Sequence, residues 1–259
     1  MPPSSMNGSA GRAPSSPGVR WVVGESFLQA ATQPDVITAT QLRASLRAEP
    51  PAEGTTLRIC PGLGVDETEW HDLTSELVEE YGCRVLPEGR PPRAVPRHRV
   101  LKHSRDNVVI GDAQAEEGRF SAWLAVVNDT EMLRDHTAEQ QHVPGMLLIE
   151  AAIQAVTWAV SELYPAPDGL PPYYAVMHAC SFDFRRFVFP LPTRLTGVLT
   201  QTAPDEPGKT PLRAEVRIQQ AGKDCSTVRI DLRAFQSDLV FAVEDGQAKS
   251  AISRTAIAS

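Results

Sequence analysis

The chain has 259 residues, of which 42% are hydrophobic and 22% charged. This composition is typical of globular proteins and excludes fibrous, collagenous and wholly disordered classes. The length allows one large or two small domains. The net charge is −7, whereas a protein that neutralises many phosphates usually carries a positive balance, so we expect no nucleic-acid partner.

The four cysteines are scattered and form no CxxC pair. This spacing indicates reduced core cysteines rather than a disulfide framework or a zinc site, and we expect no bound metal. The N-terminal segment lacks the apolar stretch of a signal peptide. The longest apolar stretch, 146–160, is short for a bilayer and carries Glu150 and Gln154. We therefore expect a cytoplasmic protein with no membrane partner.

Residues 1–18 are rich in Pro, Ser and Gly and are predicted to form a disordered tail. Residues 19–87 read as a small β-α-β-α-β segment. Its strands are predicted at 20–27, 55–60 and 83–86, and its helices at 38–48 and 70–82. This α/β segment is small for an independent core, so docking on the next segment is the alternative to standing alone. The proline-rich residues 88–96 indicate a semi-rigid linker.

Residues 97–236 combine one long helix with antiparallel strands. The helix is predicted over 145–163, after a strand at 119–127 and before strands at 175–184, 193–201, 212–220 and 225–234. The last two strands alternate apolar and polar residues and are joined by a turn at 221–224, which predicts a hairpin with one buried face. The expected fold class is α+β, with an antiparallel sheet wrapped around a central helix. Residues 237–259 have weak periodicity and are left as a C-terminal tail.

The start of the long helix carries the clearest chemical signal. Pro144 and Gly145 precede the helix, whose first amides have no intrahelical acceptor and can point at an oxygen that gains negative charge. Glu150 and Gln154 begin a polar stripe on an otherwise apolar helix. The stripe is either a solvated surface or the polar seam of a mostly buried helix, and the apolar surroundings favour the seam.

His136, Pro144, Gly145, Glu150 and Gln154 stand at offsets 0, 8, 9, 14 and 18. This spacing resembles the hotdog-fold β-hydroxyacyl-ACP dehydratases, whose motif runs from a catalytic His through Pro-Gly to a catalytic Glu with a Gln four residues on. The segment HVPGMLLIEAAIQA more closely resembles the A-factor (γ-butyrolactone) biosynthesis hotdog family. The resemblance covers about residues 95–236 and implies a hotdog fold over the predicted domain, 97–236.

The resemblance implies an acyl-thioester enzyme of secondary metabolism. The acyl group would be linked to phosphopantetheine on acyl carrier protein or CoA, with no bound cofactor. A homodimer would bring His136 of one subunit to Glu150 of the partner subunit.

Members of the A-factor family are expected to transfer a β-ketoacyl group to a hydroxyl of dihydroxyacetone phosphate. In that reaction His136 would be the general base, and the amides of Gly145 and Met146 would hold the thioester oxyanion. Glu150 would orient the reacting groups, supported by Gln154. With the same groups, a dehydratase would use His136 as base and Glu150 as acid. A thioesterase and a non-catalytic acyl-binding protein are further alternatives.

Three other side chains are candidates. His142 either lines the site or stabilises the entry to the helix. Arg185 and Arg186 are predicted to face opposite sides of a strand, so that one of them binds a substrate phosphate. A surface ion pair is the alternative for this pair.

Overall fold

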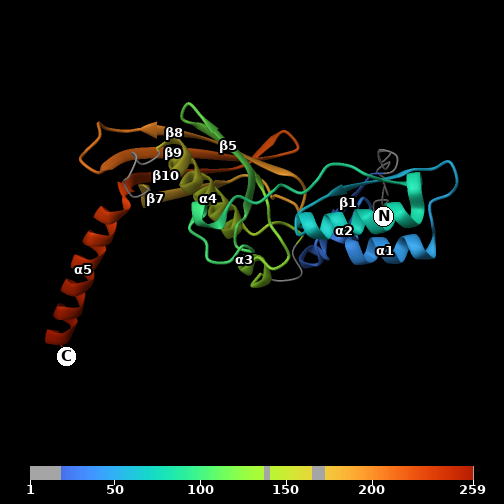
Figure 1. Ribbon diagram of the computed structural model, residues 1–259, viewed down its shortest axis with the longest axis horizontal. Coiled ribbons are helices and arrows are strands. Elements are labelled where there is room, and N and C mark those ends of the chain that lie inside the picture. Colours follow the sequence, from blue (N-terminus) through green and yellow to red (C-terminus); the bar gives the residue numbers. More distant parts are fainter. Residues whose placement is uncertain (1–18, 137–140, 165–172, 259) are drawn as a thin grey trace, which may run out of the picture.

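The computed structural model describes residues 19–136, 141–164 and 173–258, so the predicted disordered tail, 1–18, lies outside the described residues. The molecule is elongated (Figure 1). A small parallel sheet with its helices forms one end, and a large antiparallel sheet with helix α4 forms the other. Helix α5 extends away from the large sheet and ends at the C-terminus.

The α/β segment contains a four-stranded parallel sheet in the order β2-β1-β3-β4. Its strands are β1 (Val19–Val23), β2 (Val36–Thr38), β3 (Leu57–Pro61) and β4 (Val85–Pro87), and its helices are α1 (Ala39–Ala48) and α2 (Glu67–Tyr81). Short 3-10 turns lie at Glu25–Phe27, Ala30–Thr32 and Gly82–Arg84. Both predicted helices are confirmed, and each begins at a capping box, formed by Thr38 with Gln41 and by Asp66 with Glu69. Strand β2, three residues long, was not predicted.

The α/β segment docks on the rest of the chain. It has a small core of its own around Ile59 and Leu73, but Phe27 and Leu63 belong to the main hydrophobic core. Leu63 donates its amide hydrogen to Pro190 O at 3.0 Å, and Gly64 donates to Val126 O at 2.8 Å. The carboxyl ends of β1 and β3 are therefore closed by the larger unit.

The proline-rich stretch 88–96 is not a free linker. Ala94 forms an antiparallel bridge with Gly111 of strand β5 (Ile110–Glu116), and Val95 donates to Ile110 O at 3.1 Å. These bonds satisfy backbone groups at the edge of the large sheet. The prolines suit this place because an edge segment needs few amide donors. The stretch continues into a 3-10 turn at Arg97–Val100.

The large sheet has six antiparallel strands in the order β5-β6-β8-β9-β10-β7. The strands after β5 are β6 (Arg119–Leu124), β7 (Tyr173–Phe184), β8 (Thr193–Gln201), β9 (Lys209–Gln220) and β10 (Lys223–Gln236). The predicted hairpin is confirmed as β9–β10. Its turn residues Ala221 and Gly222 both have positive φ, at 49° and 73°, which is the conformation that a two-residue hairpin turn requires. Strand β5 was not predicted.

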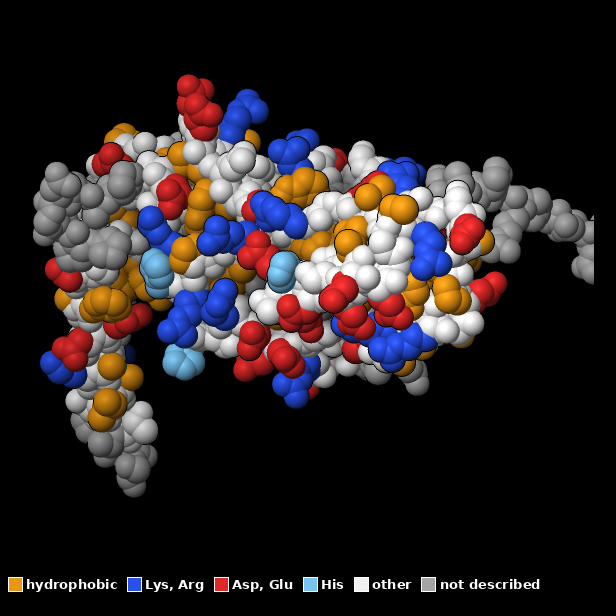
Figure 2. Space-filling model, turned by 45° about the vertical axis from the view of Figure 1, so that its right-hand side comes forward, with side chains coloured by type: hydrophobic (Ala, Val, Ile, Leu, Met, Phe, Trp, Pro, Cys, Tyr) orange, Lys and Arg blue, Asp and Glu red, His pale blue; other side chains and the backbone are white. Residues whose placement is uncertain are grey.

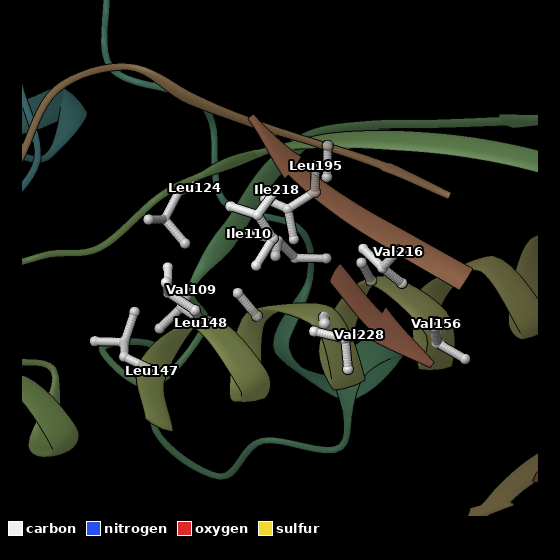
Figure 3. Packing of buried hydrophobic residues seen from close by; sticks show 14 of the residues in the cluster. Val109, Ile110, Leu124, Leu147, Leu148, Val156, Leu195, Val216, Ile218 and Val228 are labelled. Atoms are coloured by element: carbon white, nitrogen blue, oxygen red, sulfur yellow. The ribbon is translucent and has the colours of Figure 1, made fainter. Parts of the chain in front are cut away.

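Helix α4 (Gly145–Leu163) has the predicted bounds and contacts all six strands of the large sheet. Its buried face includes Ala151, Ala155 and Ala159, each fully buried, and these small side chains let the helix approach the sheet closely. Around them pack large apolar residues such as Leu148 of the helix and Ile218 of β9 (Figure 3). The short helix α3 (Glu131–Arg134) precedes α4.

Two helices carry further information on the chain's apolar residues. By length and composition α4 is apolar enough to cross a membrane, and half of that apolar window is buried inside the protein. The stretch 237–259, left unassigned above, forms helix α5 (Ser237–Ala258). Beyond Val240 its described side chains are exposed. A helix exposed on all sides has no apolar stripe, which is why its periodicity was weak.

Candidate functional site

The start of α4 presents two backbone donors. Pro144 is the N-cap residue, and its carbonyl oxygen accepts from Leu147 and Leu148. Among the described residues, no hydrogen bond uses the amides of Gly145 and Met146. A Cβ atom at Gly145 would meet Phe182 Cε1 at 4.0 Å and nothing nearer. The helix start is therefore not tightly packed at Gly145.

Both candidate histidines lie near this helix start. The imidazole centroids of His136 and His142 are 6.4 Å apart, and His142 lies 4.6 Å from the ring of Phe187. The backbone holds this arrangement, because Val143 donates to Val188 O at 2.7 Å and so joins the helix entry to the segment after β7. Burial lowers the pKa of His142 below the ordinary value of 6.5, and the nearby His136 lowers it further.

An aromatic cluster continues from these imidazoles onto β7. The rings of Phe187 and Phe184 are 5.5 Å apart, and those of Phe184 and Phe182 are 6.1 Å apart. Phe184 and Phe187 are exposed, as is Met146 at the helix start. This cluster contacts His142 through Phe187 and approaches the helix start through Phe182.

Glu150 and Gln154 meet one turn further along the same helix. Gln154 is fully buried and donates to Glu150 Oε1 at 2.8 Å. It also donates to Asn107 O at 2.7 Å and accepts from the Val109 amide at 2.9 Å. The polar seam of a mostly buried helix is thus confirmed. Through Gln154, hydrogen bonds connect the segment 107–109 to helix α4.

Lys102 completes this group, since its Nζ lies 2.5 Å from Glu150 Oε1. The side chain of Glu150 is only 15% exposed. The carboxyl therefore forms an ion pair with an ammonium and accepts a hydrogen bond from an amide at once. Lys102 comes from an irregular segment without periodicity, and no sequence pattern marked it as a partner of the helix.

Arg185 and Arg186 do not lie on a strand, because β7 ends at Phe184. Both amides donate to Cys225 O, at 2.9 and 3.0 Å, so the two residues turn away from the ladder together. Arg185 pairs with Asp183 at 3.0 Å, which is the surface ion pair given above as the alternative. Arg186 donates to Asp224 O at 3.0 Å. A phosphate at these two residues stays a prediction.

Several solved structures are similar to this chain. A putative thioesterase from Lactococcus lactis is 14% identical with a TM-score of 0.37, and covers 49% of this chain and 93% of its own. A mutant thioesterase from Pseudomonas aeruginosa is 16% identical with a TM-score of 0.38, and the match covers 56% of this chain and 97% of that one. A thioesterase from Haemophilus influenzae is 14% identical with a TM-score of 0.37, and the match covers 50% of this chain and 80% of that one. A search of curated proteins found no match.

A match to a family domain identifies the family of this chain. The AfsA A-factor biosynthesis hotdog domain matches residues 87–236, which is more than half of the chain. The match begins with the stretch that bonds to β5 and ends with the last residue of β10. The helix start, both histidines, Glu150 and Lys102 all lie inside it. This chain belongs to the A-factor biosynthesis hotdog family.

Proposed function

We propose that this protein is a hotdog enzyme that transfers a β-ketoacyl group from a phosphopantetheine thioester to a hydroxyl acceptor such as dihydroxyacetone phosphate. The observation that carries the proposal is the start of α4. There, two amides without an acceptor among the described residues lie beside a pair of imidazoles. Amides aimed at a developing oxyanion and an imidazole base are what acyl transfer requires.

The reaction begins when His136 takes the proton of the acceptor hydroxyl. The hydroxyl oxygen attacks the thioester carbon, and the amides of Gly145 and Met146 stabilise the negative oxygen of the tetrahedral intermediate. The C–S bond then breaks, and the imidazolium returns its proton to the departing thiolate. The products are an ester and a free thiol.

Glu150 suits an orienting role in this reaction. Its carboxyl pairs with Lys102 and accepts from Gln154, both at Oε1, so its position is held, and it can accept a further hydrogen bond from a substrate hydroxyl. Donation of a proton to a leaving hydroxyl, as in a dehydratase, would have to compete with these two donors.

A homodimer is part of the proposal. Strand β7 is an edge strand, and its ladder partner β10 covers only one side. Most of the strand from Met177 onward is exposed, including Met177 and Phe184. A long edge with exposed apolar side chains is a template for pairing with another chain. Pairing there would place a second copy beside the aromatic cluster and the two histidines.

Mass spectrometry of a β-ketoacyl thioester, with and without dihydroxyacetone phosphate, tests the reaction. We expect an acyl ester and free thiol only with the acceptor. His136→Ala should lower the rate by about 100-fold or more, as expected for loss of a general base. Gly145→Ala should keep the fold and lose most of the rate, because the new methyl group fills the space beside the amides. His71→Ala, on the exposed side of α2, is the control.

Each other outcome has a definite meaning. Loss of one water from a 3-hydroxyacyl thioester without an acceptor would identify a dehydratase and contradict the transferase. Release of the thiol without an acceptor would identify a thioesterase. Binding without any turnover would identify a non-catalytic acyl-binding protein.

A further inference from the structure

A cleft of about 900 Å³ lies where the α/β segment meets the large sheet. Its walls come from the start of α2, the proline-rich stretch, the segment 105–113 and the end of β6. Its apolar lining includes Val108, Leu124, Val126 and Trp158. This volume is in the range of small-molecule sites, and neither His136 nor Glu150 lines it.

The basic residues around this cleft come from one short run. Residues 89–105 contain six Arg or Lys, two His and no Asp or Glu, in a chain of net charge −7. Three of the six cations have carboxylate partners: Arg90 pairs with Asp112, Arg99 with Glu162, and Lys102 with Glu150.

The other three are Arg93, Arg97 and Arg105, and among the described residues none of them has a carboxylate partner. All three line the cleft, together with His98. Figure 2 shows Lys, Arg and His side chains close to one another on one face, beside a group of Asp and Glu side chains.

The acidic residues of the cleft are already engaged. Asp112 and Glu67 both lie within ion-pair distance of Arg90, at 3.1 and 3.9 Å. Asp66 accepts from the Glu69 amide as the cap of α2, and Asp106 accepts from Ser104 at 3.2 Å. Asp66 and Asp106 have no cationic partner among the described residues, so three unpaired arginines face two unpaired carboxylates in the lining.

The backbone of the arginines is held in place. Arg93 O accepts from Asp112 at 3.0 Å in the bridge to β5, and Arg105 O accepts from Val108 at 3.0 Å. Arg97 O accepts from the Lys102 amide at 2.9 Å, and the Arg97 guanidinium donates to His103 O at 2.5 Å. Guanidinium groups on a fixed backbone lose less entropy when they bind an anion.

We infer that this cleft binds a phosphate ester of a small organic group, with the phosphate on Arg93, Arg97 and Arg105 and the organic part on the apolar floor. Guanidinium groups bind phosphate through paired hydrogen bonds, and Pro92, Ala94 and Pro96 of the lining offer accessible apolar surface. The ester is either a free metabolite or a phosphopantetheine arm. The site goes beyond the proposed acyl transfer and does not depend on it.

Isothermal titration calorimetry of the full chain tests this site with phenyl phosphate, 4′-phosphopantetheine and, as the probe without phosphate, phenol. We expect phenyl phosphate to bind and phenol not to bind. Arg93→Gln and Arg105→Gln should each weaken phenyl phosphate binding about tenfold or more, the loss typical of a charged hydrogen bond. Higher salt should weaken it further.

Arg119→Gln is the matched control. Arg119 is exposed on β6, has no ion-pair partner among the described residues and lies outside the cleft. It should leave the affinity unchanged, and thermal melts of all variants check folding. Tighter binding of 4′-phosphopantetheine than of phenyl phosphate would assign the cleft to a carrier arm, and the reverse to a free metabolite. No binding of either phosphate, or equal losses in Arg119→Gln and Arg105→Gln, would overturn the inference.

Discussion

Single residues decide how the polar groups of α4 are stabilised. Gln154 is fully buried, and its amide bonds Asn107 O, the Val109 amide and Glu150 at the same time. A buried polar group is tolerated only when its hydrogen bonds are made. Gln154 therefore joins the catalytic candidate to the segment that also forms a wall of the cleft.

Replacing this amide tests the role of Gln154. Gln154→Leu leaves the Val109 amide and the Asn107 carbonyl without a partner, so the free energy of unfolding should fall by about 1–3 kcal/mol. Urea unfolding measures this change. Gln201→Leu, at an exposed side chain, should change it by less than about 0.5 kcal/mol. Equal effects of the two substitutions would show that the buried bonds of Gln154 contribute nothing.

The pKa of His142 makes stability depend on pH. Because burial lowers that pKa below 6.5, the folded protein binds fewer protons than the unfolded chain at pH values between the two. Stability should therefore fall as the pH drops from about 6.5 through the folded pKa. Thermal melts at several pH values should show a smaller fall in His142→Asn than in the wild type, with His71→Asn as the control. An equal fall in all three proteins would contradict this account.

At the scale of elements, β7 is the strand that an oligomer would use. It is twelve residues long, and its outer edge has no ladder partner among the described strands. Proteins usually protect such edges with charges or prolines. The exposed part of β7, from Met177 onward, carries apolar Met177 and Phe184 and a single carboxylate, Asp183.

Charges on this edge should prevent pairing. In analytical ultracentrifugation the wild type should sediment as a dimer, and the double variant Met177→Lys/Phe184→Lys as a monomer. Val198→Lys is the control, since Val198 is as exposed as Met177, at 43%, but lies on the interior strand β8. A monomeric wild type, or a double variant that still dimerises, would contradict the expected dimer.

At the scale of the whole molecule, the docking of the α/β segment depends on close backbone contact. A Cβ atom at Gly24 would lie 2.4 Å from Gly64 O and 2.2 Å from Asn128 Oδ1. Gly64 in turn has a φ of 89°, which favours glycine. Only glycines let β1 and β3 meet the segment after β6 in this way.

Gly24→Ala should therefore destabilise the protein by about 1–3 kcal/mol, as overpacking does, and should open the joint between the two parts. Thermal melts measure the first effect, and limited proteolysis within 88–96 measures the second. Gly246→Ala in the exposed helix α5, where a Cβ meets nothing within 4 Å, should be neutral or slightly stabilising. Unchanged proteolysis of Gly24→Ala would show that this contact does not hold the two parts together.

Local pattern was sufficient for much of this protein. The bounds of α4, the β9–β10 hairpin and the presence of α1 and α2 follow from periodicity and turn residues, each of which involves residues close in the chain. The polar seam was also readable, because Glu150 and Gln154 are four residues apart on one helix.

Only the tertiary structure decided the contacts between distant segments. It joined Lys102 to Glu150, brought Phe187 to His142, bonded the proline-rich stretch to β5 and gathered three arginines at one cleft. None of these pairs has a fixed spacing in sequence, because loops and sheet edges, rather than a helical or strand repeat, bring them together. The amino-acid sequence by itself determined α1, α2, α4, the β9–β10 hairpin and the family motif, and the packing of the elements determined which side chains meet.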